Sequence, residues 1–353
     1  MKKNLRNILT LALGFVTIIA TAQTWDADSR TRVDMGGDND QFTTEQRISL
    51  GASWGGDGWG INLGTVSNYA LEGGTGMALD LLMVTEAYAT TDLMGFATVA
   101  VGRQALEYGS GRLIGANDWS AYPNTRDGGV FTINNDMMDL DFGLYNDQAD
   151  SVGSEGETDY FINVSKSDGD WSVNLTYISN ANESNAMGLD FGYAMMGGDL
   201  DLAVSYNTAS DGVEGSEDMD MMSLGATYNV NDNMSISATR STSGDGGFGW
   251  GGSNYGSGTA AANWADYGNM GNLSANDEDL AVAVSYAMGD FSIGIGMHKV
   301  TNTEADDYER NVTEANLSYT MSDNANVGIK YATDNAGGDD DVKYMWLTLS
   351  VSP

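Results

Sequence analysis

Apolar and small polar residues alternate at every second position along most of the chain. Residues 200–207, for example, read LDLAVSYN, with the leucines, valine and tyrosine on alternate positions. Successive side chains of a β-strand point to opposite faces, so one face of such a segment is apolar and the other is small and polar. The same pattern recurs over most of the chain, and it predicts an all-β protein.

A tyrosine precedes a short polar turn four times in the C-terminal half of the chain. The four are Tyr193, Tyr228, Tyr286 and Tyr319. A soluble sandwich or solenoid also alternates, but it does not require tyrosine at a fixed distance from each turn. An aromatic girdle at the membrane–water interface does require it. The pattern therefore favours a single antiparallel up-and-down transmembrane β-barrel, with lipid outside and water inside.

The alternation predicts eighteen strands, with sixteen as the main rival count. Their approximate ranges are 29–35, 43–54, 59–67, 79–90, 94–105, 127–134, 138–146, 157–166, 170–179, 186–196, 199–208, 219–230, 233–242, 279–288, 291–301, 310–321, 325–333 and 342–351. The facing of the strand over 94–105 stays open, because its pattern has too little contrast.

Short connections alternate with longer ones along the chain. The short ones are 55–58, 91–92, 135–137, 167–169, 197–198, 231–232, 289–290 and 322–324. Outer-membrane barrels have an even number of strands, short periplasmic turns and longer extracellular loops. We therefore expect both chain ends on the periplasmic side.

Residues 1–22 have the features of a secretory signal peptide. Lys2, Lys3 and Arg6 give a positive start, an apolar run covers 8–19, and 20–22 is a small-residue cleavage site. The run is short for a spanning helix. We expect residues 23–353 to form one barrel domain in the outer membrane of a Gram-negative bacterium.

The chain is strongly acidic and contains no cysteine. Its 353 residues include 15 Lys and Arg against 50 Asp and Glu. Residues 1–22 hold three of the basic residues and no acidic one, so the net charge of the remainder is −38. This charge argues against nucleic acid as a partner and favours cations near the surface. The absence of cysteine excludes disulfides, thiolate metal ligands and a thiol nucleophile.

Residues 101–119, VGRQALEYGSGRLIGANDW, resemble a segment of the alginate-export family of outer-membrane barrel porins. The similarity extends over 101–128, where residues 126–128 read RDG. The resemblance implies an outer-membrane channel and, more specifically, export of a polysaccharide such as alginate. It also implies that Arg103, Arg112 and Arg126 lie at or near the pore.

Eight charged residues are candidates for the lining or constriction of a pore. Alternation places Arg30, Arg32 and Arg47 on the lumen side, with Asp80 and Glu86 on the polar face of another strand. The resemblance adds Arg103, Arg112 and Arg126. A basic wall opposite carboxylates creates a transverse field that sorts small solutes by charge. The alternative is that the arginines pair with lumen carboxylates and stiffen the wall.

Neither a reaction nor a cofactor is indicated. His298 is the only histidine, on the polar face of its strand, and no nucleophile-elbow motif accompanies it. Four acidic clusters, at 38–40, 214–220, 304–307 and 339–341, could hold Ca²⁺ through oxygen ligands. None has the spacing of a calcium loop, so a solvated acidic surface is the favoured interpretation.

The segment 244–277 carries no strand pattern. It contains aromatic residues among many glycines, namely Phe248, Trp250, Tyr255, Trp264 and Tyr267. It could fold into the pore, stack on sugar rings at the mouth or remain a mobile loop. Long segments without secondary structure are often functional, so we favour the inward fold.

Taken together, the sequence predicts a porin-like channel for passive diffusion of small hydrophilic solutes, with no enzymatic activity. The expected partners are outer-membrane lipid and small solutes, cations or saccharides. The alternatives are a polysaccharide exporter, for which a neutral or weakly charged glycan suits the acidic chain better than a polyanion, and a closed barrel used for surface binding or adhesion. The oligomeric state stays open.

Overall fold

The computed structural model describes residues 24–35, 43–71, 82–117, 119–135, 137–146, 158–251, 271–305, 307–335, 338 and 341–352. The expected signal peptide lies outside the described residues, as does Asp80. In the part of the chain that is described, no helix is long and apolar enough to cross a membrane.

Eighteen antiparallel strands form the fold, as the alternation predicts. They are β1 (Thr24–Asp34), β2 (Thr43–Gly56), β3 (Trp59–Ala70), β4 (Met83–Leu93), β5 (Ala97–Gln104), β6 (Arg126–Asn134), β7 (Asp139–Asn146), β8 (Thr158–Asp168), β9 (Trp171–Ser179), β10 (Asn185–Met195), β11 (Leu200–Ser210), β12 (Met219–Asn231), β13 (Met234–Ser243), β14 (Asp277–Met288), β15 (Phe291–Asn302), β16 (Glu309–Ser322), β17 (Ala325–Asp334) and β18 (Val342–Val351).

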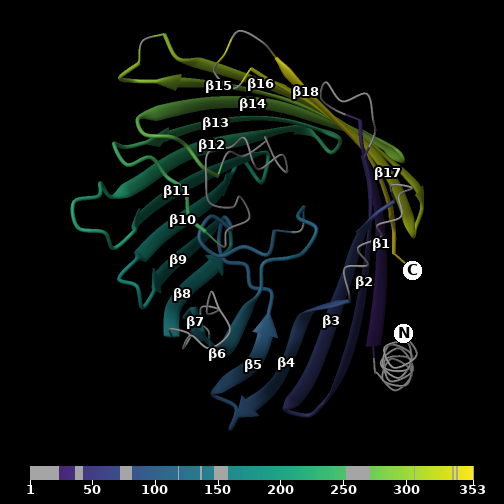
Figure 1. Cartoon of the computed structure of the whole chain (residues 1–353), viewed down its shortest axis with the longest axis vertical. Coiled ribbons are helices and arrows are strands. Elements are labelled where there is room, and N and C mark those ends of the chain that lie inside the picture. Colours follow the sequence, from purple (N-terminus) through teal and green to yellow (C-terminus); the bar gives the residue numbers. More distant parts are fainter. Residues whose placement is uncertain are drawn as a thin grey trace, which may run out of the picture.

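The strands close into a barrel, seen end-on in Figure 1. Each strand pairs with the next along the chain, and β18 pairs back onto β1 with Ser29 opposite Val351. Closure gives every strand a hydrogen-bonded neighbour on both sides. A spanning sheet needs this, because unpaired backbone groups are costly in hydrocarbon.

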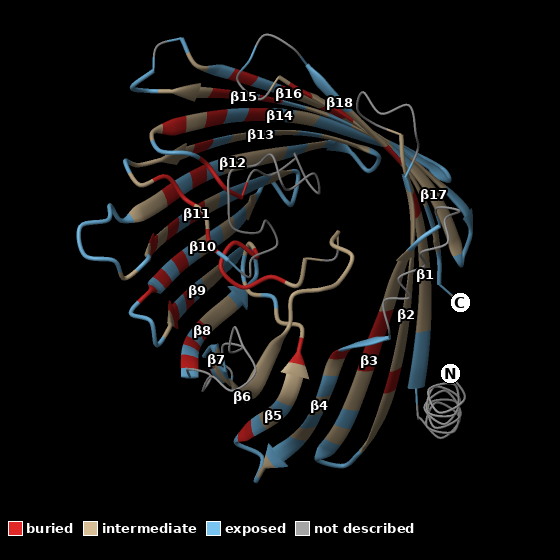
Figure 2. Cartoon of the chain, in the orientation of Figure 1, coloured by how far each residue is buried: buried red, intermediate tan, exposed pale blue. Residues whose placement is uncertain are grey.

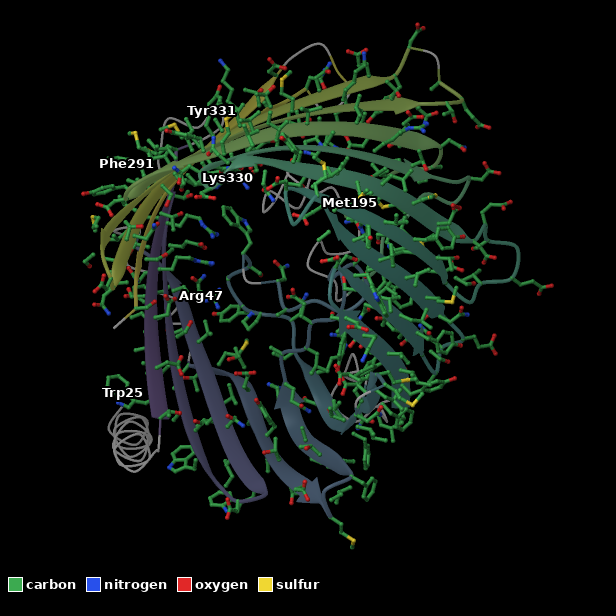
Figure 3. All side chains as sticks on the ribbon, turned by 180° about the vertical axis from the view of Figure 1, so that it is seen from behind. Trp25, Arg47, Met195, Phe291, Lys330 and Tyr331 are labelled. Atoms are coloured by element: carbon green, nitrogen blue, oxygen red, sulfur yellow. The ribbon has the colours of Figure 1, made fainter. Side chains whose placement is uncertain are left out.

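The two faces of the wall separate apolar from polar side chains. Tyr193, Tyr228 and Tyr286 are exposed on the outer face beside the short turns, as expected of a girdle. Tyr319 packs on Phe291 with their ring centroids 4.5 Å apart. Figure 3 shows side chains on both faces of the wall, including those that extend into the lumen. The alternation therefore predicted the two faces correctly.

Several strand boundaries differ from the sequence prediction by a few residues, and two of the differences have a clear cause. The first strand begins at Thr24 rather than near 29, because residues 24–28 continue the ladder with β2. The turn after β4 lies at residues 94–96 rather than at 91–92, which still pair with β5. Gly95 adopts a positive φ of 76°, and its N–H donates to the Asp92 carboxylate at 2.6 Å. The αL-type backbone at Met94 and Gly95 fixes the turn there.

Long and short connections lie at opposite ends of the barrel, so the long-loop end is extracellular. The connection from β5 to β6, residues 105–125, turns into the barrel instead of extending outward (Figure 1). In Figure 2 it is coloured mainly as buried and intermediate. This segment is named the strap below. It positions the candidate site.

Candidate functional site

The strap, residues 105–125 without the undescribed Asp118, contacts two opposite walls of the lumen. One set of its contacts is to β10, and the other is to β1 and β2. In the ring of eighteen strands, β1 and β10 lie on opposite sides. The strap therefore spans the lumen and divides it.

The first lobe of the strap, residues 108–114, is a tight loop. The N–H of Tyr108 donates to the Ile114 carbonyl at 3.1 Å, and the N–H of Gly111 donates to the Tyr108 carbonyl at 3.0 Å. Gly109 has a φ of 56°, and a Cβ there would clash with the Asp190 carboxylate. The N–H of Ser110 donates to that carboxylate at 2.8 Å. Glycine at 109 thus permits the close approach to β10.

Apolar packing holds the first lobe against the wall. Leu113 and Ile114 are buried, and the Tyr108 ring lies 5.2 Å from the Phe161 ring. Gly143 on the neighbouring strand leaves room for Phe161, since a Cβ there would overlap the ring. Burial, followed by the nearby Asp141 carboxylate, raises the pKa of the Tyr108 hydroxyl above its usual range.

The second lobe, residues 116–124, meets three arginines of the opposite wall. Arg30 Nη2 donates to the carbonyl oxygens of Trp119 at 3.1 Å and Ser120 at 3.0 Å. Arg32 Nη1 donates to the Trp119 carbonyl at 3.2 Å. Arg47 Nη1 donates to the Ser120 carbonyl, also at 3.2 Å. Three guanidinium groups therefore converge on two consecutive carbonyls of the strap.

The indole of Trp119 adds to this anchor. The guanidinium of Arg32 lies 3.7 Å from the ring centroid, and the Lys330 ammonium lies 5.2 Å from it. Trp346 on β18 packs edge-on against Trp119, with centroids 5.6 Å apart. These are the distances of cation–π and edge-to-face aromatic contacts. The strap end is therefore fixed by charge-assisted and aromatic contacts together.

The group of Arg30, Arg32, Arg47 and Lys330 is named the basic cluster. Arg32 and Arg30 form salt bridges with Glu45 at 3.0 and 3.8 Å. Lys330 forms one with Glu314 at 3.4 Å. Arg30, Arg32 and Lys330 thus form salt bridges with two carboxylates, and Arg47 adds a fourth basic side chain to this part of the lumen wall.

Arg112 and Arg126 lie on the far side of the strap from the basic cluster. Arg112 is buried in the first lobe, beside a cavity of about 660 Å³ that Asp190 and several serines and threonines also line. The guanidinium of Arg126 lies 5.5 Å from the Tyr145 ring centroid, next to a cavity of about 560 Å³. Each of the two residues thus lines a cavity inside the barrel.

Glu86 lies beneath the start of the strap. Its carboxylate accepts a hydrogen bond from the backbone N–H of Ala105. This hydrogen bond joins Glu86 on β4 to the first residue of the strap. Asp80, expected on the same face, lies outside the described residues.

Arg103 differs from its expected position at the pore. Arg103 lies two residues after Val101 in β5, so the two side chains share a face, and Val101 is exposed on the outer face of the barrel. Its guanidinium pairs with Asp127, with Nε–Oδ1 and Nη2–Oδ2 distances of 2.7 and 2.6 Å. The facing of this strand was ambiguous in sequence because Thr98, Ala100 and Gly102 make the inner face small.

Four residues of the candidate site were not singled out by the sequence pattern. They are Glu45, Trp119, Asp190 and Lys330. Lys330 and Asp190 lie on polar positions of strands whose alternation was clear, so their facing could have been read. Trp119 belongs to the motif-bearing segment 101–119, but its contact with β1 depends on how the strap crosses the lumen.

The two described ends of the aromatic segment 244–277 pack on the inner wall, and residues 252–270, on which the expected inward fold depends, lie outside the described residues. Phe248 forms an isolated β-bridge with Leu273, and both are buried with Trp250. Tyr255, Trp264 and Tyr267 lie outside the described residues. His298 is buried on the lumen side, with Nδ1 2.8 Å from Oδ2 of Asp279. Within the described ranges, no three His, Asp or Glu side chains gather as they would around a metal ion.

Comparison with known proteins agrees with this architecture. The family model described as Gram-negative porin matches residues 10–351. The chain therefore belongs to the Gram-negative porin family, and it is an outer-membrane channel for small solutes. The family finding supports a porin and not specifically an alginate-export-like one. No curated protein sequence matches the chain.

Solved outer-membrane channels of Pseudomonas aeruginosa have a similar fold. OccK5 (OpdH) superposes with a TM-score of 0.73 at 14% identity, covering 94% of this chain and 98% of that one. The structure of OpdK with vanillate superposes with a TM-score of 0.72 at 11% identity, and the match covers 93% of this chain and 98% of that one. OccK3 (OpdO) superposes with a TM-score of 0.72 at 15% identity, and the match covers 96% of this chain and 97% of that one. At these identities the likeness concerns the fold.

Proposed function

We propose that the strap is the constriction of this channel and that the basic cluster sorts small hydrophilic solutes there by charge. The observation that carries the proposal is the convergence of Arg30, Arg32 and Arg47 on the carbonyls of Trp119 and Ser120. A loop tied to opposite walls narrows the water-filled passage. A solute that passes must come close to the side chains that hold it.

The charge of the cluster opposes the charge of the chain. The whole chain has a net charge of −35. At the strap, however, four basic side chains lie together, and three of them form salt bridges with Glu45 and Glu314. The acidic surface concentrates cations, and the basic cluster attracts the anionic groups of a passing solute. Small solutes that carry an anionic group are therefore held briefly at the strap.

The experiment is the reversal potential of single channels in a KCl gradient, for the wild type and for Arg47→Gln. Glutamine keeps a donor near the Ser120 carbonyl but removes the charge. The reversal potential is expected to move toward cation preference. Arg103→Gln is the matched control, because Arg103 pairs with Asp127 on the outer face. An equal shift in both variants would overturn the assignment of the basic cluster as the sorting element.

The similarity of residues 101–128 to the alginate-export family supports a second candidate, the export of a polysaccharide. The similar segment includes the whole strap, so it lies where a permeating chain would pass. A glycan passing through would have to run alongside the strap. Block of the single-channel current by neutral or anionic oligosaccharides, added from the periplasmic side, would support this candidate. No block at concentrations that block the known exporters would rule it out.

A further inference from the structure

One cavity of the lumen lies between the first lobe of the strap and the wall. It has a volume of about 660 Å³ and is bounded by Gly109, Ser110 and Arg112 of the strap and by strands β8 to β13, the teal and green part of the wall in Figure 1. Small-molecule sites in proteins have volumes of roughly 300–1,000 Å³. The cavity is therefore large enough to hold a small solute directly beside the strap.

Hydroxyl side chains are the main polar groups of this part of the wall. Six of them make no hydrogen bond to another protein group among the described residues, namely those of Ser165, Ser167, Ser172, Thr227, Ser237 and Thr239. Other hydroxyls are used within the wall, since Ser223 and Ser241 bond each other at 2.7 Å. A hydroxyl donates one hydrogen bond and accepts two. The six can therefore bond a solute that presents both donors and acceptors.

Three small residues form a recess at the centre of the cavity wall. Gly192 pairs in register with Ala203, and Ala203 pairs with Gly225. At the two ends of this row, Ser172 pairs with Gly192 and Thr239 pairs with Gly225. Neighbouring strands lie about 4.8 Å apart, so the three small residues leave a recess with a hydroxyl on each side. This part of the wall is named the hydroxyl recess.

The ionisable side chains of the cavity balance in charge. Among the described residues that line it, Arg112 from the strap and Asp190 from β10 are the ionisable ones. The Asp190 carboxylate accepts a hydrogen bond from the N–H of Ser110 at 2.8 Å. Neither an anion nor a cation gains a net attraction from one guanidinium and one carboxylate together. The lining therefore favours an uncharged solute that forms many hydrogen bonds.

We propose that the hydroxyl recess is a subsite for small uncharged polyhydroxy solutes, the class of polyols and monosaccharides. Each hydroxyl of such a solute both donates and accepts, so bonds to the wall replace bonds to water. A neutral hydrogen bond adds little net free energy in competition with water, so the solute is held loosely. Conduction needs binding that is favourable enough for entry and weak enough for exit. The subsite does not depend on the sorting of charged solutes by the basic cluster.

The test is interruption of the single-channel KCl current of the purified barrel by glucose, with triethylene glycol as the comparison solute. Triethylene glycol has few hydroxyls and accepts hydrogen bonds mainly through ether oxygens. Glucose should interrupt the current with a saturable concentration dependence, and triethylene glycol should not. Ser172→Ala/Ser237→Ala/Thr239→Val removes three wall hydroxyls and should raise the apparent Kd for glucose about tenfold.

A second variant tests the recess without removing a hydroxyl. Ala203→Leu places a large side chain in the recess and should also raise the apparent Kd for glucose about tenfold or more. Ala238→Leu is the matched control, because Ala238 is exposed on the outer face of β13. It should respond to glucose as the wild type does. Steady ohmic conductance in KCl shows that each variant is folded.

Three results would overturn the proposal. The first is an equal effect of glucose and triethylene glycol, which would show discrimination by size alone. The second is wild-type glucose affinity in both the triple variant and Ala203→Leu. The third is an equal loss of affinity in Ala238→Leu and Ala203→Leu, which would show a general effect on the barrel. The reversal potential of Arg47→Gln, by contrast, tests only the basic cluster, so the two proposals fail separately.

Discussion

The guanidinium of Arg32 lies 3.7 Å from the indole centroid of Trp119 and donates to the carbonyl of the same residue at 3.2 Å. One side chain of the wall thus holds both the ring and the backbone of the strap. Neither contact alone would fix the loop, because the carbonyl contact leaves the ring free and the ring contact leaves the backbone free. The double contact explains why the strap can cross a water-filled lumen in one conformation.

Removal of the indole tests this anchor. Trp119→Ala deletes the contacts to Arg32, Lys330 and Trp346, and because Trp119 is half-buried the loss of stability should stay below the ~3 kcal/mol of a fully buried aromatic. The second lobe should loosen, and single-channel recordings should show larger and noisier currents. Trp25→Ala is the control, since Trp25 is exposed on the outer face near the periplasmic end. Currents as quiet as those of the wild type in Trp119→Ala would contradict the anchor.

Gly109 should be intolerant of any side chain. Gly109→Ala combines the cost of positive φ, about 1 kcal/mol, with a clash against Asp190. Gly169→Ala is a matched control, because Gly169 has a φ of 59° but nothing within 4 Å of a new Cβ. Chemical unfolding should show a larger loss of stability for Gly109→Ala than for Gly169→Ala. Equal losses would mean that the close approach to β10 does not matter.

The carboxylate of Glu45 should act opposite to the arginines on selectivity. Glu45→Gln removes a negative charge that pairs with Arg32 and Arg30 at 3.0 and 3.8 Å. The local charge becomes more positive, so the reversal potential in a KCl gradient should move toward anion preference. The shift should shrink in 1 M salt, where the Debye length is about 3 Å. A shift toward cations would show that Glu45 does not face the permeation path.

The raised pKa of Tyr108 predicts a specific alkaline sensitivity. The pKa of a tyrosine in the unfolded chain is about 10. Just above that pH the phenol of Tyr108 is ionised in the unfolded chain but still protonated in the folded chain, because folding raises its pKa. The stabilising contribution is complete below that pH. It is lost as the pH rises further, at up to about 1.4 kcal/mol per pH unit.

The measurement for Tyr108 is the free energy of unfolding at several pH values between neutral and strongly alkaline, for the wild type and Tyr108→Phe. Phenylalanine keeps the ring against Phe161 and removes the titrating group. The wild type should therefore lose more stability above pH 10 than the variant does. Parallel curves would show that Tyr108 is not the group responsible.

Much of the barrel could be predicted from the sequence because alternation and tyrosine position both report on the lipid face. Tyr193 and Tyr286 marked the periplasmic edge correctly. The facing of Arg103 could not be predicted, since its strand has small residues on the inner face and thus no contrast. The crossing of the lumen by the strap depends on contacts such as Ser110 with Asp190, which are 80 residues apart in sequence. No local pattern reports such a contact.

The most direct test of the strap as constriction is single-channel conductance in 1 M KCl, where fixed charges are screened and conductance reflects geometry. The triple variant Arg30→Gln/Arg32→Gln/Arg47→Gln removes the charged contacts to Trp119 and Ser120, and Arg103→Gln serves as the control. Release of the strap predicts a clearly higher conductance for the triple variant and an unchanged conductance for the control. Unchanged conductance in a folded triple variant would contradict the account.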